Sequence, residues 1–198
     1  MNYKNILIIL IFFIFPNKSF GLIEVDITRG NLNPLPIAIS SLSSDSSTKN
    51  ELSKSLNVQD VGLEISKVIE NNFRQSGLFN PLDKDSFLQK PDIAHLKPRF
   101  EDWSLIKAQA LITGKVTYSE DKLRVEFRLW EVLAAKEMMA LAFTTVPKNW
   151  RRVGHIISDK VYERLTGEKG YFDTRIIFVS EKGPKTQRIK KLAIMDQD

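Results

Sequence analysis

The chain has 198 residues, 42% of them hydrophobic and 27% charged, with a formal net charge of +5. These proportions are those of an ordinary globular protein and exclude an intrinsically disordered one. The absence of cysteine excludes a disulfide framework, a thiolate zinc site, a cysteine nucleophile and a lipid anchor on an N-terminal cysteine.

Residues 1–21 have the pattern of a secretory signal peptide. Lys4 provides a positive charge, residues 6–15 form an unbroken apolar run, and Pro16 ends it. Ser19 and Gly21 are small residues at the positions of a cleavage site, so we expect cleavage after Gly21. The alternative is an uncleaved anchor, but the run is well short of the ~20 residues that a spanning helix needs. We therefore expect an exported protein with no transmembrane segment in the mature chain.

The charge of the mature chain argues against nucleic acid as a partner. The signal peptide carries two of the 29 basic residues and none of the 24 acidic ones, so the net charge falls to +3. That charge is small and is not gathered in one stripe. The basic cluster within residues 182–191 is typical of a solvated strand face.

The start of the mature chain predicts two short strands and a loop. Residues 22–27 alternate weakly and predict a strand, at the edge of a sheet or completing it, and residues 37–39 predict a short buried strand. Between them lies a turn with two prolines. Residues 40–49 contain six serines and no apolar period, which predicts a loop.

The clearest helix follows. Within residues 58–73 the apolar side chains share one helical face, with Asn57 or Asp60 as the N-cap and Gly77 as the C-terminal stop. Residues 78–82 then predict a short extended piece. Residues 83–100 are broken by two prolines, and a short helical turn is expected around the next tryptophan.

Two strands with alternating side chains come next, at residues 112–118 and 123–129, and residues 137–146 predict a third strand, which Pro147 ends. This alternation is typical of a sheet with one face in water and one face covered. The two amphipathic helices are the candidates for the cover. The predicted fold class is therefore α/β (α+β), a mixed, antiparallel-rich sheet with two amphipathic helices on one face.

The second helix ends in a tight joint. Residues 150–165 have helical apolar spacing, and Gly167 falls where a left-handed residue ends a helix. Gly170 marks a second break, and an apolar strand-like run begins at residue 176. We interpret this stretch as the boundary between one domain and the start of another.

No catalytic, cofactor or metal site is indicated. The sequence lacks a Gly-x-Gly phosphate loop and a Gly-x-Ser-x-Gly nucleophile elbow. His95 and His155 are far apart, and His155 adjoins the apolar stripe of the second helix, which favours a core or boundary histidine over a metal ligand. The three tryptophans are interpreted as core aromatics. We expect neither an enzyme nor a small-molecule substrate.

Two blocks of sequence are distinctive: residues 150–162 read WRRVGHIISDKVY, and residues 166–176 read TGEKGYFDTRI. These blocks closely resemble the TolB family, periplasmic components of the Tol-Pal envelope system of Gram-negative bacteria. Shorter matches support the resemblance at residues 27–30, 36–39, 77–83, 113–116 and 125–130.

The resemblance implies three segments: a signal peptide at residues 1–21, an α/β N-terminal domain at residues 22–173, and the first strands of a truncated β-propeller at residues 174–198. It also implies a periplasmic location and two protein partners, TolA and Pal. In the family the propeller carries most of the contact with Pal, and the mature N-terminal segment engages TolA. By position, the implied TolA-binding residues are Leu22, Ile23, Glu24, Val25, Asp26, Ile27, Thr28, Arg29 and Gly30.

The resulting hypothesis is a non-enzymatic interaction protein that supports outer-membrane integrity and outer-membrane invagination during division. Two alternatives stay open. One is an envelope-assembly or secretion accessory protein with a similar α/β domain, and the other is the front end of a propeller-containing peptidase.

Overall fold

The structure, a computed structural model, describes residues 33–196. The predicted signal peptide, the strand at residues 22–27 and the TolA-binding residues 22–30 lie outside this range. In chain order the elements are β1 (Leu35–Ile39), β2 (Ser43–Ser44), α2 (Ser46–Leu56), α3 (Val61–Ser76), β3 (Phe79–Pro81), the 3-10 turn η1 (Lys84–Ser86), α4 (Pro91–Leu96), α5 (Phe100–Leu105), β4 (Ala110–Ser119), β5 (Lys122–Glu131), β6 (Lys136–Thr145), η2 (Pro147–Asn149), α6 (Trp150–Thr166), β7 (Arg175–Lys182) and β8 (Ile189–Asp196).

The sheet is mixed, as the sequence predicts. Its strand order is β3-β1-β4-β5-β6, and the short β2 pairs with β4 beside this path. β1 is parallel to β3 and β4, whereas β4, β5 and β6 form an antiparallel meander. The turn between β4 and β5 has positive φ at Glu120 and Asp121, which matches the right-handed twist of the two strands.

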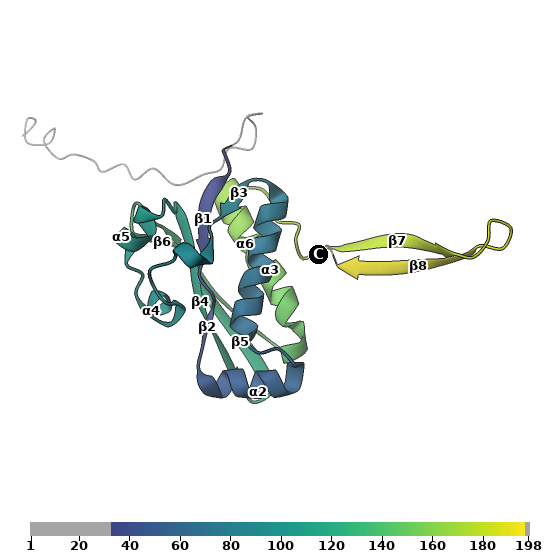
Figure 1. Ribbon diagram of the computed structural model, residues 1–198, viewed down its shortest axis with the longest axis horizontal. Helices are drawn as coiled ribbons and strands as arrows, with labels where there is room; N and C mark the ends of the chain where they lie inside the picture. Colours follow the sequence, from purple (N-terminus) through teal and green to yellow (C-terminus); the bar gives the residue numbers. More distant parts are fainter. Residues whose placement is uncertain (1–32, 197–198) are drawn as a thin grey trace, which may run out of the picture.

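Helices α3 and α6 pack together on one face of the sheet (Figure 1). Their apolar stripes meet the inward side chains of β1, β4 and β5 in the main hydrophobic core, in which Ile65 and Ile157 are fully buried. The two helices approach closely at Gly154, where an added Cβ would lie 2.9 Å from Val68 Cγ1. Two amphipathic helices on one face are therefore confirmed.

The predicted helix ends are also confirmed. The side chain of Asp60 accepts a hydrogen bond from the Leu63 amide at the start of α3, which selects Asp60 over Asn57 as the N-cap. Gly77 and Gly167 end α3 and α6 in the left-handed conformation, with φ of 70° and 75°. No helix in the described range is long and apolar enough to cross a membrane.

The serine-rich stretch is not a loop throughout, so that prediction was wrong in part. β2 occupies residues 43–44, and α2 begins at Ser46. Asp45 starts this helix because its Oδ1 accepts a hydrogen bond from the Thr48 amide at 2.7 Å. The helix then buries Thr48 and Leu52, which fix it across one end of the sheet (Figure 1).

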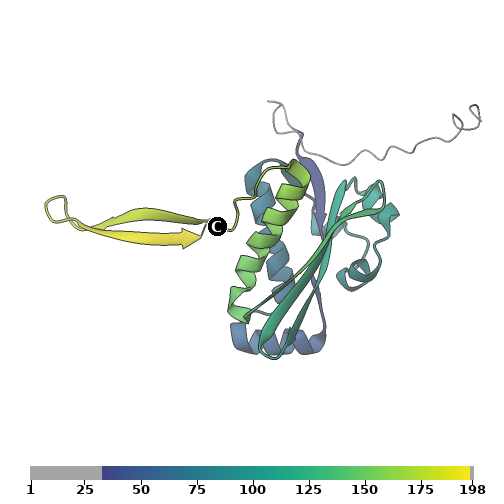
Figure 2. The ribbon, with the colours of Figure 1, turned by 180° about the vertical axis from the view of Figure 1, so that it is seen from behind.

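The second face of the sheet is covered over part of its length, which the alternation alone does not predict. The segment with α4 and α5 lies across this face, on the side opposite α3 and α6 (Figures 1 and 2). It forms a second small core in which Trp103 and Leu111 are buried. Trp103 donates to the Oε1 of Gln89 at 3.2 Å, so the indole N–H is satisfied inside this core.

Strands β7 and β8 form a separate two-stranded hairpin that projects away from the α/β domain (Figure 1). Its eight residue pairs run from Arg175 with Asp196 to Lys182 with Ile189.

Candidate interaction sites

The described part of the chain offers three features that bear on interaction: the joint after α6, the β7–β8 hairpin, and a hollow on the open face of the sheet. The nine sequence-predicted TolA-binding residues are outside the described range, so the structure places none of them. It describes the chain from Asn33, just before β1, where Leu35 donates to the Leu78 carbonyl at 2.9 Å.

The joint is held by the side chain of Asp159, in the third turn of α6. Its Oδ1 accepts a hydrogen bond from the Phe172 amide at 2.6 Å, and its Oδ2 accepts one from the Asp173 amide at 3.1 Å. Gly170 is required for this approach because a Cβ there would lie 2.4 Å from the Asp159 Cα. Gly170, the second glycine of the joint, is therefore needed for close packing against α6 rather than for a turn.

An ion pair and an aromatic cluster secure the same segment. The guanidinium of Arg152 holds the carboxylate of Asp173 through Nε at 3.0 Å and Nη2 at 3.1 Å, and this contact raises the pKa of Arg152. Phe172 is 2% exposed and meets the rings of Phe73 and Tyr162 edge to face. The chain is thus fixed to α6 up to residue 173 and leaves the domain directly afterwards.

Replacing Asp159 with alanine should release this joint. The amides of Phe172 and Asp173 would lose their acceptor, and we expect a loss of about 1–3 kcal/mol in the free energy of unfolding. Asp159→Asn is the matched control, because it keeps one acceptor oxygen and should cost less. Amide hydrogen exchange at residues 172 and 173 provides the measurement, and unchanged exchange in Asp159→Ala would refute the assignment.

The β7–β8 hairpin exposes apolar side chains on both of its faces. Ile176, Ile177, Phe178 and Val179 are consecutive, so they alternate between the faces, and their exposed fractions are 44%, 67%, 40% and 55%. Strands of this kind are usually buried on both sides in a larger sheet assembly. The basic residues of the hairpin are exposed, as predicted, and Arg188 and Lys190 both pair with Glu181.

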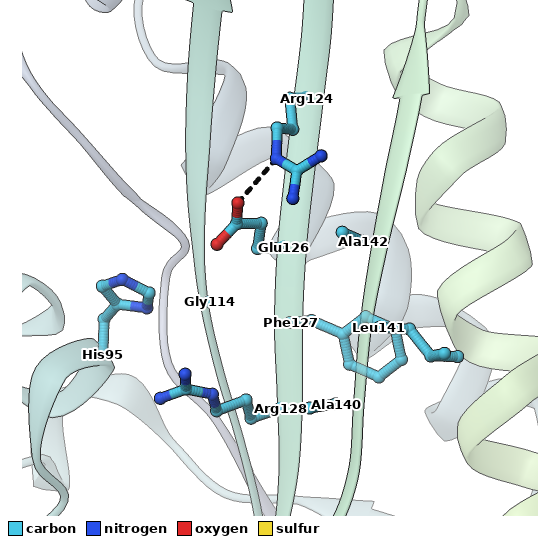
Figure 3. Close-up of a pocket in the computed structure, with 9 residues that line it drawn as sticks. All are labelled: His95, Gly114, Arg124, Glu126, Phe127, Arg128, Ala140, Leu141 and Ala142. Carbon is cyan, nitrogen blue, oxygen red and sulfur yellow. Dashed lines mark hydrogen bonds and ion pairs between the residues drawn. The ribbon is translucent and has the colours of Figure 1, made fainter.

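A hollow of about 220 Å³ lies on the open face of the sheet, next to α4 (Figure 3). Arg124, Glu126 and Arg128 of β5 project from this face, and Ala140 and Ala142 of β6 lie beside them in the ladder. His95 of α4 forms the opposite wall of the hollow.

The side chains in and around this hollow carry a small net positive charge. Arg124 Nε donates to Glu126 Oε1 at 2.6 Å, which lowers the pKa of the Glu126 carboxyl. Burial lowers the pKa of His95, and the positive charges of Arg128 and Lys115 lower it further. With its pKa lowered, His95 adds little positive charge at pH 7, and the charge around the hollow comes from Arg124, Arg128 and Lys115 against Glu126 and Glu137.

Two of the side chains considered from the sequence for possible chemistry, His155 and Trp130, make structural contacts. The Asn72 amide nitrogen lies 3.1 Å from His155 Nδ1 and 2.9 Å from Ser158 Oγ, so His155 is a buried histidine in a polar cluster between α3 and α6. Trp130 donates to Thr113 Oγ1 at 2.9 Å. Within residues 33–196 no three His, Asp or Glu side chains are grouped to hold a metal ion.

Comparison with known proteins gives consistent matches. The curated "Tol-Pal system protein TolB" of Pelagibacter ubique (strain HTCC1062) is 76% identical over 189 residues, which is 96% of this chain. The chain spans 42% of the length of that relative.

A solved structure shows the same fold. The crystal structure of TolB from Acinetobacter baumannii superimposes with a TM-score of 0.63 at 21% sequence identity, covering 83% of this chain and 37% of that one. The family description "TolB amino-terminal domain" matches residues 23–138, more than half of the chain. The chain therefore belongs to the TolB amino-terminal domain family.

Proposed function

We propose that this protein is a non-enzymatic component of the Tol-Pal system that acts in the periplasm through protein–protein contacts. The observation that carries the proposal is the 76% identity to a Tol-Pal system protein along nearly the whole chain. Residues 1–21 would direct export and be cleaved after Gly21. The mature chain would support outer-membrane integrity and the invagination of the outer membrane during division.

The proposed partners are TolA and Pal. Residues 22–30 would bind TolA by strand addition, in which backbone hydrogen bonds supply affinity and alternate side chains supply selectivity. Ile23, Val25 and Ile27 share one side of such a strand, and Glu24 and Asp26 share the other. Pal would make most of its contact with the β-propeller.

The proposed domain boundary lies between residues 173 and 174. The hydrogen bonds from Phe172 and Asp173 to Asp159 tie the chain to the α/β domain up to this point. The apolar faces of the β7–β8 hairpin favour its assignment as the first strands of a propeller blade, because a blade would cover both faces. Residues 22–173 and 174–198 would then belong to different domains.

The role in the envelope is testable in the organism that carries the gene. Depleting the protein should release periplasmic proteins into the medium, increase detergent sensitivity and delay outer-membrane constriction. The intact gene should restore all three properties, whereas a variant lacking residues 22–30 should not, although the protein is still exported and folded. Depleted cells with an intact envelope and normal constriction would contradict the proposal.

A further inference from the structure

The β6 strand forms an unpaired edge of the sheet in the described range. It pairs with β5 on one side and ends the strand order on the other. The strand has ten residues and contains no proline, and Ala140, Leu141 and Ala142 at its centre are all exposed. A long edge of this kind offers a row of backbone donors and acceptors to another strand.

On the open face of the sheet, β6 carries small side chains next to the positively charged arginines of β5. Ala140 pairs in register with Arg128, and Ala142 pairs with Glu126. Because alanine fills little space, the hollow of about 220 Å³ reaches β6, where Ala140, Leu141 and Ala142 line it (Figure 3). Larger side chains on β6 would block access from this edge to the arginines of β5.

The existing ion pairs of the two arginines can exchange partners. Arg128 lies 3.4 Å from Glu137, with side-chain exposures of 43% and 42%. Arg124 is also about half exposed in its pair with Glu126. Exposed pairs of this kind contribute little stability. A carboxylate from an added strand could therefore join either arginine without the loss of a buried interaction.

The opposite face of β6 is apolar. Met139 and Phe143 are half-buried against the main core, and Leu141 between them is 39% exposed. A strand added to β6 would place alternate side chains against this apolar row and the others over the alanines. A strand added to β6 would therefore need one kind of side chain on the open face and a different kind on the apolar face.

We propose that the β6 edge binds an extended segment of another protein whose side chains alternate between acidic and apolar. The acidic side chains lie over Ala140 and Thr144 and reach Arg128 and Arg124, which are the register partners of these two residues on β5. Neighbouring strands are about 4.8 Å apart, so the acid and the arginine bridge about 10 Å between their backbones, a span that glutamate and arginine cover together. The apolar side chains pack beside Leu141. This surface is independent of the proposed function of residues 22–30.

Two synthetic peptides test the proposal, one alternating Glu and Val and one alternating Lys and Val. Each is titrated into the isotopically labelled chain, with amide NMR shifts as the readout. We expect the Glu peptide to bind about tenfold more tightly than the Lys peptide, because like charges repel at the arginines. The largest shifts should fall at residues 137–145, and binding should weaken as salt is added.

Substitutions separate this site from other surfaces. Ala140→Glu should abolish Glu-peptide binding, because the new side chain fills the space above β6 and its carboxylate pairs with Arg128. Ala135→Glu is the matched control: it makes the same change at an exposed position just before β6 and should leave binding unchanged. Circular dichroism confirms that both variants are folded. Equal binding of both peptides, or binding by Ala140→Glu, would overturn the proposal.

Other occupants of the edge give different results. If a second copy pairs along β6, the same shifts will change with protein concentration alone, and sedimentation will show a dimer. If residues 22–30 of the same chain occupy the edge, replacing Glu24 and Asp26 with lysine will increase peptide affinity. Either result would overturn the assignment to a separate partner.

Discussion

Replacing Ile65 or Ile157 with alanine should lower the free energy of unfolding by about 2–5 kcal/mol, the usual cost of truncating a fully buried isoleucine. Both side chains are 0% exposed, one in the second turn of α3 and the other near the middle of α6. They lie in the main core with the inward side chains of the sheet, so each substitution leaves a cavity that the rigid strands cannot fill.

Chemical denaturation of the chain measures this effect, and Ile93→Ala is the matched control. Ile93 lies on α4 and is 51% exposed, so its truncation should change the unfolding free energy by less than about 0.5 kcal/mol. Equal midpoints for the three variants and the wild type would show that the stripes of α3 and α6 do not form the core.

Deleting residues 22–27 should abolish binding of the TolA C-terminal domain. In the proposed function these residues supply the added strand, and the main core in the described range is built from side chains between Leu35 and Phe172. Val25→Pro should have nearly the same effect, because proline removes one backbone donor and fixes φ. Val25→Ala keeps the backbone donor and should retain most of the affinity.

Titration of the TolA domain against the wild type and the three variants gives this comparison, with circular dichroism as the folding control. Undiminished binding by the folded deletion variant would show that TolA does not use residues 22–27. If Val25→Ala and Val25→Pro lose the same affinity, the contact depends on the valine side chain rather than on backbone pairing.

The elements predicted well are those with a long, regular apolar period. In β5 the alternation from Leu123 to Leu129 fixes one buried face by itself, and the structure confirms it. The helix ends are equally local, because Asp60 at the start of α3 and the glycines at the ends of α3 and α6 act within one turn of the helix end.

The elements that were missed depend on contacts distant in sequence. α2 contains few apolar residues, and its position rests on the burial of Leu52 in the main core and on the Asp45 cap. The cover on the second face rests on Gln89, which accepts from Trp103 and from the Arg99 amide across a segment broken by prolines. Neither arrangement leaves a periodic signal in the sequence.

The candidate sites also divide into features that the sequence predicts and features that depend on contacts distant in sequence. The joint after α6 was predicted from its glycines, but the role of Asp159 was not, because an aspartate inside a helix is typical of a solvated position. The hollow beside β6 was also missed. Arg124, Glu126 and Arg128 have the alternation of a wet strand face, and only the fold places His95 opposite them. The TolA-binding residues 22–30 remain a prediction from family resemblance.

An amide NMR titration of the labelled wild-type chain with the TolA C-terminal domain tests the central claim most directly. The account predicts shift changes concentrated in residues 22–30, with the amides of the sheet, α3 and α6 nearly unchanged. Saturable changes confined to residues 33–196, with no change in residues 22–30, would contradict it.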